Sequence, residues 1–140
     1  MDNRWLRASF LIVLFLGLAC SSGGGSGGGG QAQAIDAPAS VAGLTFDATV
    51  TSGSGVFATM GTFRISFTDT TYAIQGDGVN TVNSNGTYTY IATGAVGTGM
   101  LVDSLSGPLT VAFSYDASST GTYSVDSPGN GTQAGTFVEL

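Results

Sequence analysis

One cysteine, at position 20, is the residue whose chemical use is most narrowly constrained by its neighbours. It ends an uncharged, largely apolar run that spans residues 8–19, and a glycine- and serine-rich tract follows it. Because the chain has no other cysteine, no intramolecular disulfide can form. In an exported protein, a lone cysteine pairs with another molecule, stays a reactive thiol or has a special use. The surrounding sequence decides between these uses.

The first 19 residues have the features of a secretory signal peptide. Arg4 and Arg7 precede the apolar segment 10–16, and the small residue Ala19 stands at the cleavage position. The uncharged run is 12 residues long, whereas a membrane-spanning helix needs about 20 residues. We therefore expect residues 1–19 to be removed as a signal peptide rather than kept as a transmembrane anchor.

The segment Leu16-Gly17-Leu18-Ala19-Cys20 resembles the lipobox of bacterial lipoproteins. In that family the signal peptide is cut before the cysteine, which then carries a fatty acid such as palmitate. The resemblance implies cleavage between Ala19 and Cys20 and lipidation of Cys20. Gly17 and Leu18 depart from the commonest lipobox residues, and ordinary secretion with a free thiol is the alternative.

The same resemblance implies a location. A lipidated Cys20 would hold the protein in the cell envelope, and Ser21 after it is similar to the sorting preference for the outer membrane in hosts with two membranes. The periplasmic and the surface-exposed face both remain open. Residues 20–42 would then form the lipidated cysteine, a flexible tether and a lead-in, because SSGGGSGGGG at 21–30 has no apolar surface to bury.

The charge of the mature chain excludes several classes of partner. After cleavage, Arg64 is the only basic side chain beside eight acidic ones, which gives a formal charge of −7. Such a surface repels phosphate backbones and anionic headgroups. We expect no nucleic-acid binding, and contact with the membrane only through the N-terminal lipid.

Catalytic and metal-binding residues are scarce. The mature chain has no histidine, no lysine and no cysteine besides Cys20, which excludes Ser-His-Asp and Cys-His catalysis, histidine metal sites and Schiff-base chemistry. The eight acids are scattered singly, so we predict no enzyme. Asp77, Asn80, Asn83 and Asn85 offer oxygen ligands, but turns require the same residues, and we expect no metal and no cofactor.

Period-two alternation of apolar and polar residues begins after Gly43 and predicts strands. The expected strands cover residues 44–51, 62–68, 72–74, 88–92, 97–104, 109–115, 123–125 and 135–140. Asn85-Gly86 is typical of a hairpin turn and predicts one before the fourth strand. The inward side of the fifth strand stays unassigned, because Met100, Leu101 and Val102 are consecutive.

These patterns predict an all-β domain over residues 43–140, a single antiparallel meander of about eight strands that closes into a small barrel. A β-sandwich is the alternative. The layout resembles that of the calycin group, which includes lipocalins and avidins, although Gly43-Leu44-Thr45-Phe46 stands where lipocalins carry Gly-x-Trp. The resemblance implies a barrel and transfers no binding site.

The interior can be filled or hollow. Ten aromatic residues fall on the alternating apolar faces, and an eight-stranded barrel is just wide enough for side chains, which favours a filled core. Phe57 and Met60 lie in the long first loop and form a possible binding loop. The sequence thus predicts a lipid-anchored, non-catalytic barrel that acts as a binding or structural module. The alternative is a calycin-like carrier, so the partner is an unknown protein or a small apolar ligand.

Overall fold

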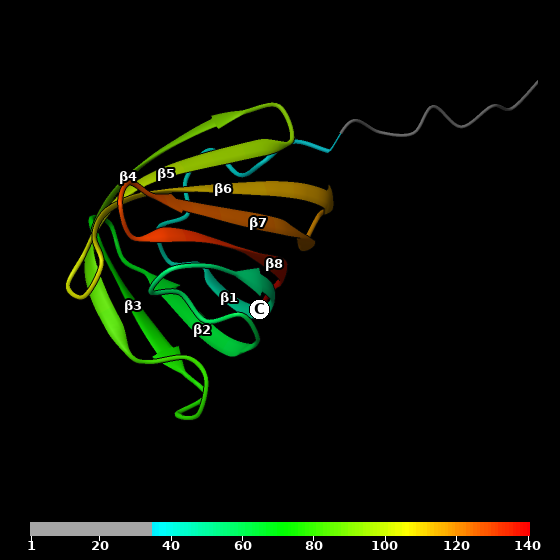
Figure 1. Ribbon diagram of the computed structural model, residues 1–140. Helices are drawn as coiled ribbons and strands as arrows, with labels where there is room; N and C mark the ends of the chain where they lie inside the picture. Colours follow the sequence, from blue (N-terminus) through cyan, green and yellow to red (C-terminus); the bar gives the residue numbers. More distant parts are fainter. Residues whose placement is uncertain (1–34) are drawn as a thin grey trace, which may run out of the picture. The chain divides into compact units, whose positions relative to one another are not determined.

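The computed structural model describes residues 35–140, which form a closed antiparallel β-barrel of eight strands (Figure 1). In chain order the strands are β1 (Thr45–Gly53), β2 (Gly61–Phe67), β3 (Thr71–Gly76), β4 (Ser84–Thr93), β5 (Val96–Asp103), β6 (Gly107–Ala117), β7 (Thr120–Ser127) and β8 (Gly131–Glu139). Each strand pairs with the next, and β8 pairs with β1 to close the barrel. The all-β meander predicted from the sequence is confirmed, in its barrel form.

The signal peptide, the cleavage site at Ala19 and the lipidation site at Cys20 lie outside the described residues. Those assignments stay predictions.

Alternation along the strands sorts side chains between the interior and the solvent. In β6, Val111, Phe113 and Tyr115 are buried inside the barrel, whereas Thr110 and Ser114, at alternating positions, are exposed. Successive side chains of a strand point to opposite faces, so a period of two produces one apolar and one polar surface. The outer face is rich in threonine and serine because only the inner face is withdrawn from water.

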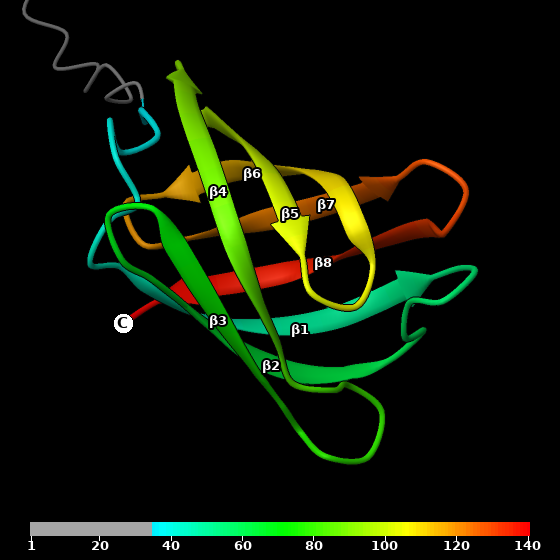
Figure 2. The ribbon, with the colours of Figure 1, turned by 90° about the vertical axis from the view of Figure 1, so that its left-hand side faces the viewer.

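The meander gives the barrel two unlike ends (Figure 2). Loops 54–60, 77–83, 104–106 and 128–130 share one end, which we call the open end. The opposite closed end carries the short connections 68–70, 94–95 and 118–119. Because every strand is antiparallel to its neighbours, alternate connections must fall at alternate ends.

The lead-in 35–44 belongs to the closed end. Ala37 and Val41 are buried in the core, and the backbone N–H of Ala37 donates to the carbonyl of Gly94 at 2.7 Å. The N–H of Gly43 donates to the carbonyl of Phe67 at 3.0 Å. The packed unit therefore includes residues before Gly43, and the described chain enters the barrel at its closed end.

Five rings fill the interior towards the closed end, and we call them the aromatic cluster. They are Phe46, Phe67, Phe113, Tyr115 and Phe137. Ring centroids lie 5.0 to 6.4 Å apart, mostly in edge-to-face pairs, a geometry that adds to the gain from burial. Gly121 makes room for them, because a Cβ there would lie 2.8 Å from the Phe137 ring.

The predicted Asn85-Gly86 turn is wrong, since both residues lie inside β4. The turn is made earlier, at Asp77-Gly78, where Gly78 has φ +75°. Gly86 is needed for space instead: a Cβ there would lie 2.0 Å from the carbonyl oxygen of Val102 and 3.1 Å from the Tyr72 ring.

The fifth strand turns Gly97, Gly99, Leu101 and Asp103 inwards and leaves Met100 and Val102 exposed. Two glycines and an aspartate on the inner face are the reason that apolarity alone could not assign it. Gly97 faces the Tyr90 ring, whose hydroxyl would lie 1.9 Å from an added Cβ.

Candidate functional site

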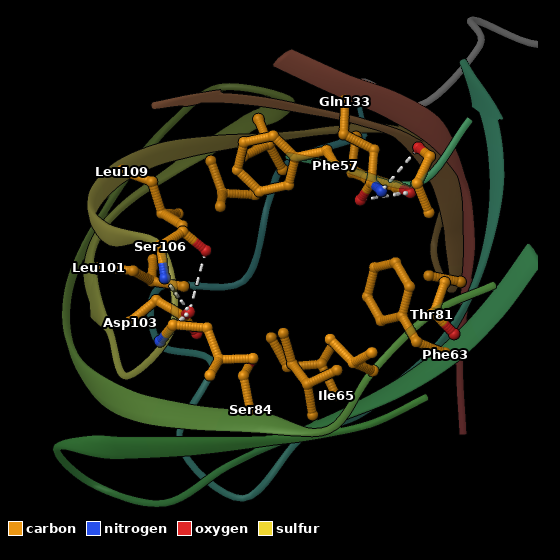
Figure 3. Close-up of a pocket in the computed structure, with 18 of the residues that line it drawn as sticks. Phe57, Phe63, Ile65, Thr81, Ser84, Leu101, Asp103, Ser106, Leu109 and Gln133 are labelled. Atoms are coloured by element: carbon orange, nitrogen blue, oxygen red, sulfur yellow. Dashed lines mark hydrogen bonds between the residues drawn. The ribbon is translucent and has the colours of Figure 1, made fainter. Parts of the chain in front are cut away.

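A hollow of about 300 Å³ occupies the barrel interior at the open end, and we call it the cup (Figure 3). The bottom of the cup is the side of the aromatic cluster that faces the open end, formed by Phe46, Phe113 and Phe137. The volume lies at the lower end of the range for small-molecule sites, which are concave and mostly apolar. The interior is therefore filled at one end and hollow at the other.

Inward-facing aliphatic and aromatic side chains make the wall of the cup. On one side they come from β5, β6 and β7, and on the other from β2 and β3; they are Leu101, Leu109, Val111, Val125, Phe63, Ile65 and Ile74. Phe63 packs edge-to-face against Tyr123 with centroids 5.6 Å apart. Figure 3 shows Phe63, Ile65, Leu101 and Leu109 around a common central space.

The first loop contributes one of the two residues that the sequence singled out. Phe57 is half-buried and lines the cup, and Figure 3 shows its ring turned inwards. Met60 is 61% exposed and is not part of the lining. The loop is fixed to the neighbouring turn, because the Val56 N–H donates to the carbonyl of Asn130 at 2.9 Å. Gln133 Nε2 also donates to the carbonyl of Ala58 at 3.1 Å.

Side-chain amides and hydroxyls tie the other loops of the open end together. Asn130 Nδ2 donates to the carbonyl of Ser106 at 2.8 Å and to Ser127 Oγ at 3.1 Å. Ser127 is itself buried and donates to the carbonyl of Pro108 at 3.1 Å. These bonds link the β5–β6 and β7–β8 turns, so the mouth of the cup is preformed on this side.

Asp103 places a carboxylate in the wall of the cup, with only 7% of the residue exposed. Its Oδ1 accepts from the Leu105 N–H and the Ser106 N–H, each at 2.9 Å, and from Ser106 Oγ at 3.0 Å. Its Oδ2 accepts from the Tyr72 hydroxyl at 2.7 Å. Burial raises the pKa of Asp103, but the hydrogen bonds from Ser106, Tyr72, Leu105 and Ser84 together outweigh it and keep the pKa below its ordinary value.

Asp77 organises the loop 77–83 through hydrogen bonds to its backbone. Asp77 Oδ1 accepts from the N–H groups of Val79, Asn80 and Thr81 at 2.7 to 2.9 Å. Those three bonds and a fourth from the Thr62 N–H hold the pKa of Asp77 well below its usual range. Within residues 35–140, no three histidine, cysteine or acidic side chains lie close enough together to hold a metal ion.

Exposed apolar side chains surround the mouth, and we call them the rim. They come from three of the four loops at the open end: Val56, Met60, Val79, Val82 and Leu105. Val79 is the most exposed of them at 86%. Single exposed apolar residues are ordinary, whereas a group around a concave site is typical of ligand or partner binding.

The sequence did not predict that Asp103 and Gln133 line a site. Both lie on inward positions of their strands, so once β5 and β8 are registered their place in the interior follows from alternation. A polar residue at an inward position near the end of a strand is the sequence signal that could have identified both residues as part of a site.

Comparisons with known protein families, with curated protein sequences and with solved structures gave no match. In the part of the chain that the structure describes, no helix has the length and apolar character needed to cross a membrane.

Proposed function

We propose that this protein is a lipid-anchored protein of the cell envelope whose barrel binds a small apolar molecule in the cup. The observation that supports binding is the hollow of about 300 Å³, open at one end and lined mainly by aliphatic and aromatic side chains. Sites of this character bury most of a small ligand and bind it through the hydrophobic effect. This is the calycin-like alternative that the sequence left open, joined to the lipid anchor that the lipobox resemblance implies.

The point of chain entry supports a mouth that is free of the anchor. Residues 35–42 follow the proposed tether in sequence and pack on the closed end. A lipid on Cys20 would therefore be joined to the barrel at the end opposite the mouth. The proposed location is the outer membrane where the host has two membranes, with the mouth accessible to its ligand from the aqueous side.

A binding titration tests the cup directly. The described residues 35–140 contain a complete core, so the 32–140 unit is used without the leader. We expect a neutral naphthyl probe to bind it saturably at one to one. Val125→Trp, which fills the cup from β7, should weaken binding at least about tenfold. Ser124→Trp, the adjacent outward residue, is the matched control and should leave affinity unchanged.

Equal affinities of the two tryptophan variants would place the probe outside the cup and contradict the proposal. Urea unfolding of both variants checks that any loss of binding does not come from unfolding. If Val125→Trp is too unstable to measure, Ile74→Trp fills the cup from β3 on the opposite side.

Metabolic labelling tests the anchor. In bacteria fed an alkyne fatty acid, the full-length wild type should carry the label and partition into membranes. Cys20→Ala should lose both, because the thiol that accepts the lipid is absent. The remaining sequence, including the apolar leader, is unchanged in this control. Label retained by Cys20→Ala would rule out lipidation at this position.

A protein partner is the second candidate, and the rim is the observation that favours it. Met60 and Val79 are exposed and lie outside the lining of the cup, so a small ligand inside the cup leaves them uncovered. A photo-crosslinking residue at position 79 should then give one discrete adduct in intact cells. The same residue at position 124, on the outer face of β7, should give none.

A further inference from the structure

The charge of the cup, rather than its shape, suggests which apolar molecules it takes. The Asp103 carboxylate lies in the wall and is almost completely buried. The groups that donate hydrogen bonds to it come from Tyr72, Leu105, Ser106 and Ser84, and all are neutral. These bonds stabilise the ionised form and leave its negative charge uncompensated. An apolar hollow with one fixed negative charge discriminates between ligands by their own charge.

No cation of the barrel is available to balance this charge. Arg64 is the only basic side chain among residues 35–140, and it is exposed on the outer surface. There its Nε and Nη2 donate to the two carboxylate oxygens of Asp47 at 2.7 and 2.8 Å. Among residues 35–140 the cup therefore has no cationic side chain that could pair with the headgroup of a fatty acid or another anionic amphiphile.

Asp103 also keeps room for one more hydrogen bond. An ionised carboxylate offers about four acceptor positions over its two oxygens. Oδ1 already accepts three bonds, whereas Oδ2 accepts one, from the Tyr72 hydroxyl. A donor on a ligand in the cup can approach Oδ2 in competition with the Ser84 hydroxyl, which also lines the cup and helps to lower the pKa of Asp103.

We propose that the cup binds apolar amines, with Asp103 Oδ2 accepting a hydrogen bond from the ligand's ammonium group. This inference rests on the cup being the ligand site. A cavity of about 150 Å³ holds benzene, so twice that volume suits a body of about two fused rings. The ammonium supplies the counter-charge that the barrel lacks, and the rings pack against Leu101, Leu109 and Phe63.

Three ligands of almost equal size and different charge test the proposal on the 32–140 unit. They are 2-naphthylmethylamine, which is a cation at neutral pH, 2-naphthylmethanol, which is neutral, and 2-naphthoate, which is an anion. We expect the amine to bind about tenfold or more tightly than the alcohol, the gain of a charged hydrogen bond. The alcohol should in turn bind more tightly than the naphthoate, and calorimetry measures all three.

Asp103→Asn removes the charge and keeps the shape, since the asparagine Nδ2 can donate to the Tyr72 hydroxyl where Oδ2 accepted from it. The amine should then lose its advantage over the alcohol. Asp126→Asn removes an equal charge from the exposed face of β7 and should retain the full preference. The preference of the wild type should also persist in 0.5 M NaCl, because salt screens buried charges far less than exposed ones.

The outcomes are distinct. If none of the three ligands binds, the proposed function fails and this inference fails with it. If all three bind equally, the cup is a ligand site but the amine assignment is wrong. A preference that Asp126→Asn or salt abolishes would reflect the net charge of the surface and would also overturn it. Should Asp103→Asn not fold, the wild-type ranking and its persistence in salt decide alone.

Discussion

The aromatic cluster at the closed end and the cup at the open end are built on the same eight strands, but they differ in the volume of their inward side chains. In β6 the inward residues go from Leu109 and Val111 to Phe113 and Tyr115 towards the closed end. In β8 they go from Gln133 and Gly135 to Phe137 in the same direction. A narrow barrel is filled or hollow according to this distribution along its axis.

The two ends also differ in how far their buried polar side chains are hydrogen-bonded. At the closed end, the hydroxyls of Tyr90 and Tyr115 are buried without a hydrogen-bond partner among the described residues. At the open end, the buried Asp103, Ser127 and Gln133 side chains all bond to loops or neighbouring strands. Aromatic packing dominates the closed end, whereas hydrogen bonds to the connecting loops shape the mouth. We therefore expect the closed end to supply most of the stability, whereas hydrogen bonds hold the open end in place around the mouth.

The largest expected effect on stability comes from a substitution in the closed end. Phe113→Ala should lower the free energy of unfolding by about 3–5 kcal/mol, because it empties a buried site in contact with three other rings. Phe63→Ala removes the same side chain from the half-buried wall of the cup and should cost only about 1–2 kcal/mol. Urea unfolding measures both.

Thr110→Ala on the outer face of β6 is the control, with an expected cost under about 0.5 kcal/mol. Equal costs for the two phenylalanine variants would mean that the closed end and the open end are packed alike. Equal costs for Phe113→Ala and Thr110→Ala would mean that the inside and outside of β6 have been exchanged.

The strand pattern and the barrel class could be predicted because alternation in β1, β2, β6 and β8 is nearly perfect. The predictions failed at residue types that serve more than one structural purpose. Asn85-Gly86 has the composition of a turn, but Gly86 is required where Tyr72 and the Val102 carbonyl approach β4. In β5 the inward glycines hid the inner face, because they leave space for a ring that belongs to β4.

The cup was harder to predict from the sequence than the barrel. The number of aromatic residues, ten, favoured a filled interior. This number alone does not say where along the barrel axis the rings lie. In an antiparallel meander, the end of an even strand and the start of an odd strand lie at the same end of the barrel. Phe46 at the start of β1 and Phe137 near the end of β8 therefore meet, and Leu109 and Gln133 are left to the other end.

A smaller effect concerns the hydrogen-bonded acids of the open end. The pKa of Asp103 and that of Asp77 are lower in the folded protein than their ordinary values. Their carboxylates therefore stabilise the fold fully above the unfolded pKa of about 3.9, and this contribution is lost as the pH falls through the folded-state pKa. We expect the urea midpoint to fall on acidification below about pH 4.

Asp103→Asn should be less stable than the wild type at pH 7 and should show a weaker acid dependence, because the titrating group is gone. A wild-type midpoint that is constant between pH 6 and pH 3 would contradict the role given to these hydrogen bonds. The aromatic cluster has no titratable group in this range, but Arg64 also lowers the pKa of the exposed Asp47, so the difference between wild type and Asp103→Asn is what tests the open end.

The smallest expected change in stability is at the mouth. Phe57 is half-buried in a loop that main-chain bonds to Asn130 and the Gln133 amide hold in place, so Phe57→Ala should cost under about 1 kcal/mol. Its ring lines the cup, however, and the same change should weaken binding of a naphthyl probe about tenfold. Met60→Ala, in the same loop but outside the lining, should leave affinity unchanged. Calorimetric titration and urea unfolding of each variant separate the two effects. A large loss of stability in Phe57→Ala would mean that the ring is part of the core. Equal binding by both variants would mean that the first loop is not part of the binding site.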